Sequence, residues 1–365
     1  MASGDWHFMF VVVAVRCGMS CQKGGIIMAK KLKSFSAEDI FGKVRGDEEL
    51  MKEIDGDEET RGLFYEIPKE KRKPLLDFLA GKSSLDILYD TFFRKIFDPN
   101  LHRERLESLI SALMGQEAKI HFVLSREGFQ ISDKGSLVIM DIIVKLKDGS
   151  LVNVELQKIG YRFPSQRSSC YVSDMIMRQY NEKRAQKRDK FNYRDIAPVY
   201  LLVIIANSSS EFSETEEYIH RREVSYSSGV ELTETARITY VTLDTFKEKP
   251  HNIDGTLEAW LTFLTRDDLG SVLELVNRHP EFAEIYKDIA EFRKDPKELI
   301  GMFSEALKIM DHNTELFMID EMKGEINALK EQLNTQKQEL QQKEEEHQRE
   351  LRKKDEEIRM LREKK

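Results

Sequence analysis

The chain has 365 residues, of which 33% are charged and 40% hydrophobic, with 8 prolines and a formal net charge of −8. This composition is typical of folded domains and excludes collagen-like, mucin-like and integral-membrane proteins. The length predicts about two folded units, and no uncharged apolar run approaches the roughly 20 residues that cross a bilayer.

The first 27 residues differ from the rest. Residues 8–15 resemble the apolar part of an export signal, but Asp5 stands where such signals carry positive charge. The tripeptide at 23–25 can be encoded as AAA-GGA-GGA, a bacterial ribosome-binding sequence, shortly before Met28. We therefore expect translation to begin at Met28. Only three cysteines occur, which favours a reducing, cytoplasmic compartment over a disulfide framework.

Changes in charge and in hydrophobic periodicity divide the remainder into four segments. We expect a charged helical segment at 28–85, an α/β core at 86–207, a helical and mixed lobe at 208–317, and a tail at 318–365.

The core contains elements that periodicity locates in chain order. We expect an aromatic-rich turn or short helix at 90–97, an amphipathic helix at 101–113, strands at 120–124, 137–146 and 151–157, a polar helix at 166–190, and a buried strand at 199–206. The order helix, three strands, helix, strand predicts an α/β sandwich with a mixed sheet.

The lobe and the tail are mainly helical. We expect a strand at 238–243 and helices over 256–307. In the tail, apolar residues follow a heptad pattern at Ile319, Met322, Ile326, Leu329, Leu333 and Leu340. Gln336, Lys343 and His347 then interrupt it, and Leu351 resumes it in a shifted frame. The pattern predicts a weak coiled coil that joins copies of the chain, with a solvated single helix as the alternative.

Two carboxylates flank a hairpin in the core. A two-residue loop at Asp148-Gly149 would pair Asp141 with Leu156 and send Glu155 to the opposite face. A three-residue loop that begins at Lys147 would instead place Asp141 directly opposite Glu155. Both loops suit the residues, so the sequence leaves the register open.

The second register would bring like charges within about 5 Å, which destabilises a sheet unless a cation neutralises them. Asp141, Glu155 and the backbone carbonyl of Leu156 would then form an oxygen-only set suited to Mg²⁺. The alternative is that Glu155 is an ordinary solvent-facing strand residue.

A basic stretch follows the second carboxylate. Between Lys158 and Arg194 there are ten basic residues and three acidic ones. Helical spacing turns Arg167, Tyr171 and Arg178 towards one side, where they could hold a nucleic-acid backbone and stack a base. The alternative is a charged helix that only improves solubility.

These residues resemble a known family, the bacterial PD-(D/E)XK nuclease family transposases, which are related to the recombination-promoting nucleases. The resemblance extends from about Leu63 to Met322. It rests on Asp90-Thr91-Phe92-Phe93-Arg94-Lys95-Ile96-Phe97, Ser136-Leu137-Val138-Ile139-Met140-Asp141, Asn153-Val154-Glu155-Leu156-Gln157-Lys158-Ile159-Gly160-Tyr161, Gln166-Arg167-Ser168-Ser169-Cys170-Tyr171, Arg178-Gln179-Tyr180 and Ile319-Asp320-Glu321-Met322.

The resemblance implies a restriction-endonuclease-like core at 86–207, with Asp141 and Glu155 as the metal-binding acids. Gln157 would stand where the wider superfamily has its catalytic lysine, and a neutral amide cannot supply that cation. Arg167, Tyr171 and Gln179 would line the site. Met140 replaces the proline that names the motif.

The resemblance further implies that the chain is an endonuclease that uses Mg²⁺ or Mn²⁺ to cut DNA and assists transposition or recombination. The residues that would contact DNA are Lys158, Arg167, Tyr171, Arg178 and Gln179. Glu107 could add a further acid, whereas Asp90 is expected to be a helix N-cap. The second hypothesis is a catalytically weak nuclease-fold module that binds nucleic acid or a partner, and the third is a coiled-coil scaffold.

Overall fold

The computed structural model describes residues 34–126, 140–158, 165–212 and 214–363. Residues 35–365 form one compact unit. The expected start at Met28 and the segment 1–27 lie outside the described residues, as do residues 137–139 of one expected strand. The segment boundaries at 85, 207 and 317 stay predictions.

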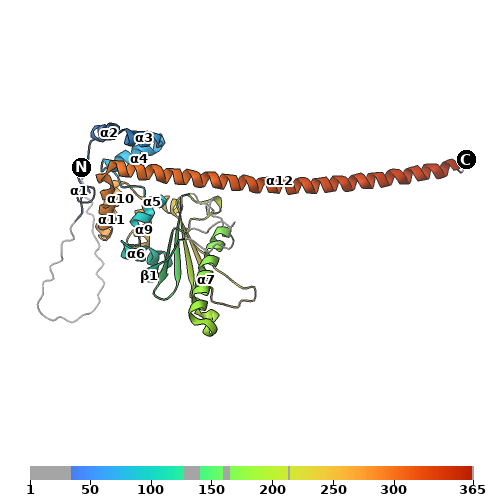
Figure 1. Ribbon diagram of the computed structural model, residues 1–365, viewed down its shortest axis with the longest axis horizontal. Coiled ribbons are helices and arrows are strands. Elements are labelled where there is room, and N and C mark those ends of the chain that lie inside the picture. The colour runs from blue at the N-terminus through green and yellow to red at the C-terminus, as the bar shows by residue number, and fades with distance from the viewer. Residues whose placement is uncertain (1–33, 127–139, 159–164, 213, 364–365) are drawn as a thin grey trace, which may run out of the picture. The chain divides into compact units, whose positions relative to one another are not determined.

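A six-stranded mixed sheet lies at the centre of the fold (Figure 1). Its strands are β1 (Ile120–Val123), β2 (Ile142–Leu146), β3 (Leu151–Gln157), β4 (Val199–Ile205), β5 (Ile219–Arg221) and β6 (Ala236–Thr242). Their order is β1-β2-β3-β4-β6-β5, with β3, β4 and β6 parallel and the other pairs antiparallel. The expected mixed sheet is confirmed.

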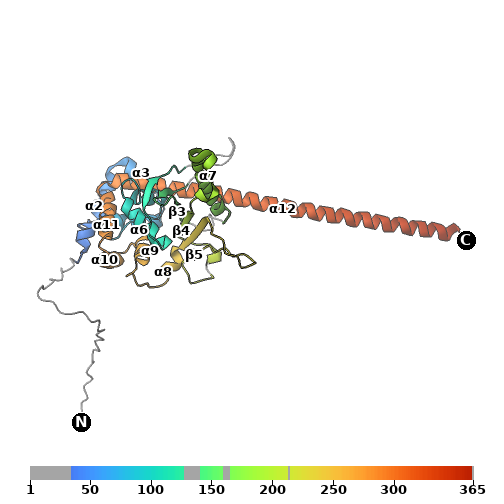
Figure 2. The same ribbon diagram turned by 90° about the horizontal axis from the view of Figure 1, so that it is seen from below.

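Helices cover both faces of the sheet (Figures 1 and 2). The long helix α7 (Ser165–Lys187) packs on one face through Tyr171, Val172 and Met175. The other face packs against helices that include α5 (Asp90–Ile96), α6 (Arg103–Met114) and α9 (Thr256–Thr265). Both faces of β4 are covered, which explains its continuous apolar run. The helices expected at 90–97, 101–113 and 166–190 are present, each with bounds that differ by a few residues.

The N-terminal helices share the core on the α6 face. They are α1 (Ala37–Phe41), α2 (Asp47–Gly56), α3 (Glu58–Glu66) and α4 (Lys69–Leu79). Their charges face solvent, while Phe41, Leu50, Phe64 and Phe78 are buried. The same core receives α8 (Leu243–Lys247), α10 (Leu269–Arg278), α11 (Phe282–Glu291) and the first turns of α12 (Pro296–Glu363).

The burial of apolar side chains decreases along the described part of α12. Leu299, Phe303 and Leu307 are buried, and the helix packs on α3 and α5. Further along, Leu329, Leu333 and Leu340 are exposed. Within the described residues, no helix combines the length and apolarity needed to span a bilayer.

The β2–β3 hairpin resolves the register that the sequence left open. Ile142 pairs with Val154 and Lys145 with Leu151, so Asp141 lies opposite Glu155. The loop is therefore the three-residue form, in which the Gly149 N–H donates to the Leu146 carbonyl at 3.0 Å. Gly149 has φ +92°, a left-handed conformation that glycine adopts without steric cost.

Candidate active site

Asp141 and Glu155 face each other at one end of the sheet, and each carboxylate accepts a hydrogen bond from a backbone N–H of the opposite strand. The Asp141 N–H donates to Glu155 Oε1 at 3.0 Å, and the Leu156 N–H donates to Asp141 Oδ2 at 2.8 Å. Asn153, two residues earlier on the same strand face, donates through Nδ2 to Glu155 Oε1 at 2.8 Å. The backbone of both strands therefore fixes the orientation of both carboxylates.

Burial makes both carboxylates poor acids. Glu155 is 1% exposed. Desolvation, followed by the charge of Asp90, raises the pKa of Asp141 to about 6. Desolvation, followed by the charge of Asp141, raises the pKa of Glu155 well above its usual value. The ionised forms of the two acids repel each other, and a cation bound between them would offset that repulsion.

Three charged residues near this pair were missed by sequence reasoning. Asp90 is the first residue of α5, and Tyr89 is the N-cap, so the expectation that Asp90 caps the helix is wrong. Burial raises the pKa of Asp90, while the charges of Arg94, Arg126 and Arg167 oppose that rise. The spacing of Asp90 and Arg94, one helical turn apart, was the available signal. Residue 126 precedes a segment with no periodic pattern, so nothing pointed to it.

The arginines reach the site from three different segments. Arg94 Nη2 lies 3.6 Å from Asp90 Oδ2 on α5. Arg126, which follows β1, donates through Nε to the Met140 carbonyl at 2.8 Å, directly before Asp141. On α7, Arg167 donates through Nη2 to the Tyr171 hydroxyl at 2.7 Å. Arg94 and Arg126 lower the pKa of Asp141, and Arg167 lowers that of Glu155.

Tyr171 is the other α7 residue that the structure brings to the pair. Its side chain is buried, and desolvation followed by the charge of Glu155 raises the pKa of its hydroxyl. A phenol with a raised pKa remains protonated, so Tyr171 is a neutral hydrogen-bonding group beside the carboxylates.

Three residues expected at a nucleic-acid surface have intramolecular partners. Lys158 lies on the other face of the sheet, as strand alternation predicts, with Nζ 2.7 Å from Asp86 Oδ2. Arg178 pairs with Asp174 through Nε at 2.6 Å. Gln179 is buried and exchanges two hydrogen bonds with the backbone of Ala197.

The two remaining candidates lie at different ends of the sheet. Gln157 ends β3, is half-buried and shares the strand face of Glu155. Glu107 on α6 accepts a hydrogen bond from the Ile120 N–H at 2.8 Å. Ile120 pairs with Leu146, which lies five residues, or about 17 Å, along the strand from Asp141, so Glu107 lies towards the other end of the sheet from the carboxylate pair.

The donor set fits a small divalent cation. Among the described residues, no hydrogen bond reaches Asp141 Oδ1 or Glu155 Oε2, so both oxygens can bind a ligand. No group of three His, Cys, Asp or Glu in the described chain could hold a metal alone. Mg²⁺ is commonly held by one or two carboxylates, with water and substrate phosphate completing its shell.

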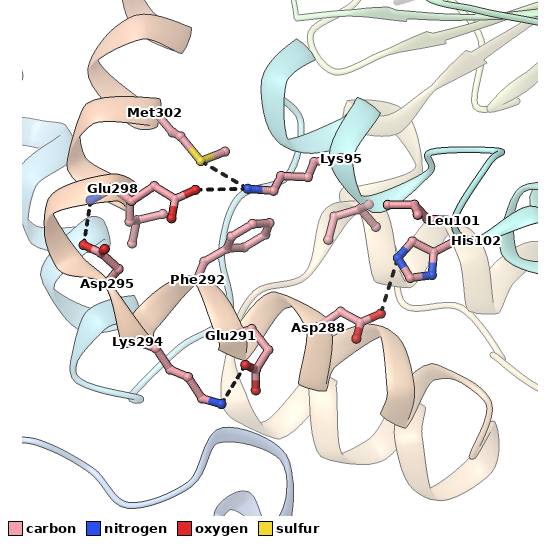
Figure 3. Close-up of a pocket in the computed structure, with 12 residues that line it drawn as sticks. Lys95, Leu101, His102, Asp288, Glu291, Phe292, Lys294, Asp295, Glu298 and Met302 are labelled. Carbon is pink, nitrogen blue, oxygen red and sulfur yellow. Dashed lines mark hydrogen bonds and ion pairs between the residues drawn. The ribbon is translucent and has the colours of Figure 1, made fainter.

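A separate hollow of about 440 Å³ lies between α5, α11 and α12 (Figure 3). Its charged groups pair with one another: Lys95 with Glu298 at 3.3 Å, and Lys294 with Glu291 at 2.6 Å. His102 lies 3.9 Å from Asp288. None of the residues that line it belongs to the carboxylate site.

Comparison with known proteins identifies the family of the chain. A family model described as "PD-(D/E)XK nuclease family transposase" matches residues 87–318, more than half of the chain. No curated protein and no solved structure matches the chain significantly.

Proposed function

The chain belongs to the PD-(D/E)XK nuclease family transposases, and from that premise we propose that it is a metal-dependent endonuclease. It would hydrolyse DNA phosphodiesters and so assist transposition or recombination. The observation that carries this proposal is the placement of Asp141 directly opposite Glu155, each oriented by backbone N–H groups. The proposed core is the restriction-endonuclease-like order α6, β1–β3, α7, β4.

In this proposal, Asp141 and Glu155 hold the cation through the oxygens that carry no hydrogen bond, with the Leu156 carbonyl as a third protein oxygen. Bound Mg²⁺ or Mn²⁺ would polarise the scissile phosphate and lower the pKa of an attacking water. Asn153 fixes Glu155 Oε1, and Leu156 fixes Asp141 Oδ2, so that both acids stay aimed at one point.

The arginines offer a replacement for the missing lysine. Gln157 stands where the wider superfamily has its catalytic lysine, and it carries no charge. Arg94, Arg126 and Arg167 each lower the pKa of a site carboxylate, so their positive charge is felt there. We propose that they stabilise the negative charge that develops on the phosphate, with Tyr171 orienting Arg167.

Cleavage of supercoiled plasmid in Mg²⁺ or Mn²⁺ tests the function. The full chain should nick the plasmid, and Asp141→Ala and Glu155→Ala should both abolish nicking. Glu107→Gln, a buried acid at the other end of the sheet, should retain it. Equal nicking by all four proteins would indicate contamination and contradict the proposal.

A binding module without strong catalysis is the second candidate, because Gln157 lacks the charge of the usual lysine. It predicts that the full chain binds DNA and metal but leaves the plasmid intact. Either function would be compatible with self-association through α12, which we propose from its exposed Leu329, Leu333 and Leu340.

A further inference from the structure

Helix α7 connects the carboxylate site to a distant surface. Arg167, near its start, acts on Glu155. Towards its end, Gln179 binds Ala197, which precedes β4, and Glu182 binds Lys145 near the β2–β3 turn. The helix thus runs back along the sheet, and Arg184 lies about 26 Å from Arg167 at 1.5 Å per residue.

The surface at this far end is basic and exposed. It includes the end of α7 and the single turns η2 (Arg188–Lys190) and η3 (Tyr193–Asp195). We call it the basic end of α7, formed by Lys183, Arg184, Arg188, Lys190, Tyr193 and Arg194. Arg184 lies in the last turn of α7, Arg188 begins η2, and the Tyr193 side chain is 74% exposed.

The nearby acids are largely neutralised by other partners. Glu182 accepts two hydrogen bonds from Lys145, at 2.6 and 2.7 Å. Asp195 pairs with Lys187 at 2.5 Å. Asp189 is the remaining acid in this stretch, so the basic end of α7 keeps a clear positive excess.

Aromatic and cation–π contacts pack the loop that carries these charges against α7. Tyr180 on α7 contacts Phe191 edge-on, with ring centroids 5.4 Å apart, and stacks on Tyr193 at 6.2 Å. Arg184 lies over the Phe191 ring at 5.8 Å. Arg188 has φ +47°, a left-handed conformation that residues with side chains rarely adopt. These ring and cation–π contacts pack the turn formed by η2 and η3 against the end of α7.

We propose that the basic end of α7 is a second DNA contact that grips the sugar-phosphate backbone about eight base pairs from the cleavage centre. The inference rests on the proposed function. The spacing follows from about 26 Å along α7 and 3.4 Å per base pair. DNA suits this surface because several exposed cations along one edge match a row of phosphates, and each neutralised phosphate releases a counterion.

Binding of duplexes of two lengths tests the proposal. The full chain, in EDTA so that no cleavage occurs, is titrated with duplexes of about 8 and about 24 base pairs while fluorescence anisotropy is followed. The variant combines Arg184→Gln, Arg188→Asn and Arg194→Gln, with Asn chosen because it tolerates a left-handed backbone. The matched control is Lys52→Gln with Arg61→Gln and Lys69→Gln, exposed residues of α2, α3 and the start of α4.

The wild type should bind the long duplex at least about tenfold more tightly than the short one, and the α7 variant should lose that gain. Its salt slope on the long duplex should fall by about 2–3, near 0.9 per lost phosphate contact. The control should match the wild type. Equal losses in both variants, or an α7 variant that binds the long duplex like the wild type, would overturn the proposal.

The result is separable from the proposed function. A chain that fails to cut plasmid but shows the length effect lacks the nuclease activity and keeps this contact. A chain that cuts plasmid but shows no length effect is a nuclease that lacks the second DNA contact. Circular dichroism of both variants confirms that each is folded.

Discussion

Asp141 lies opposite Glu155 and feels the charges of Asp90, Arg94 and Arg126, so its ionisation is linked to the stability of the protein. The raised pKa means that the folded state holds this proton to a higher pH than the unfolded state does. Protonation of Asp141 therefore contributes to the free energy of unfolding. This contribution is complete below the ordinary pKa of an aspartate and is lost as the pH rises through about 6.

We therefore expect Asp141→Asn, which keeps the shape and removes the charge, to stabilise the metal-free protein at about pH 8. The thermal midpoint in EDTA should exceed that of the wild type, and the difference should shrink towards about pH 4. Added Mg²⁺ should raise the midpoint of the wild type and not that of the variant. A variant less stable than the wild type at the higher pH would contradict the assigned electrostatics.

Asn153 is expected to act through Glu155. Its Oδ1 is buried without a hydrogen-bond partner among the described residues, so Asn153→Leu removes an unsatisfied atom and should fold normally. The substitution also removes the donor that lowers the pKa of Glu155. The acid limb of the pH–rate profile for metal-dependent cleavage should move to higher pH. An unmoved profile would mean that Asn153 only fills space.

The placement of Asp141 relative to Glu155 could be predicted from the sequence only as two alternatives, because the turn decides whether the two acids lie on the same face of the sheet. Asp90, Arg94 and Arg126 could not, since their convergence depends on packing between α5, the end of β1 and α7. Lys158 and Gln179 were expected at the nucleic-acid surface because sequence spacing does not reveal their partners, Asp86 and the backbone of Ala197.

At the level of elements, the β2–β3 turn sets the register on which the site depends. Gly149 takes a left-handed conformation, while an added Cβ would lie 3.7 Å from the Ala197 Cβ, an ordinary contact. Gly149→Ala should therefore lower the free energy of unfolding by about 1 kcal/mol through backbone strain alone.

Gly62, inside α3, provides the control for this prediction. A Cβ there meets nothing within 4 Å, so Gly62→Ala should raise the free energy of unfolding by about 0.5–1 kcal/mol. Urea titrations of both variants measure the two changes. Changes of the same sign would show that the conformation of Gly149 is not what the turn requires.

Strands β1, β3, β4 and β6, helix α7 and the first part of α12 follow hydrophobic patterns in the sequence, so their positions were predictable to within a few residues. The short strand β5 was not expected, and β2 begins at Ile142, inside the strand expected at 137–146. The choice between a two-residue and a three-residue turn was not, because Asp148-Gly149 suits both. Packing decides it: the observed register places Ile142 and Val144 in the same core as Val152 and Val154, whereas the two-residue turn would place Asp141 and Lys145 on that buried face.

For the whole molecule, the tail and the nuclease core should be separable in function. Ending the chain after Met318 keeps the buried residues Leu299, Phe303 and Leu307 and removes the exposed leucines. The shortened protein should keep metal-dependent cleavage and lose self-association. Light scattering measures the mass of each form, and an unchanged mass would contradict a role for the tail in assembly.

The central claim is that Asp141 and Glu155 together form a divalent-cation site. Calorimetric titration of the full chain with Mn²⁺ tests it most directly, beside Asp141→Asn, Glu155→Gln and the distant control Glu107→Gln. We expect Mn²⁺ to bind saturably to the wild type and to the control and not to bind to the other two variants. Equal binding by all four proteins, or none by the wild type, would contradict it.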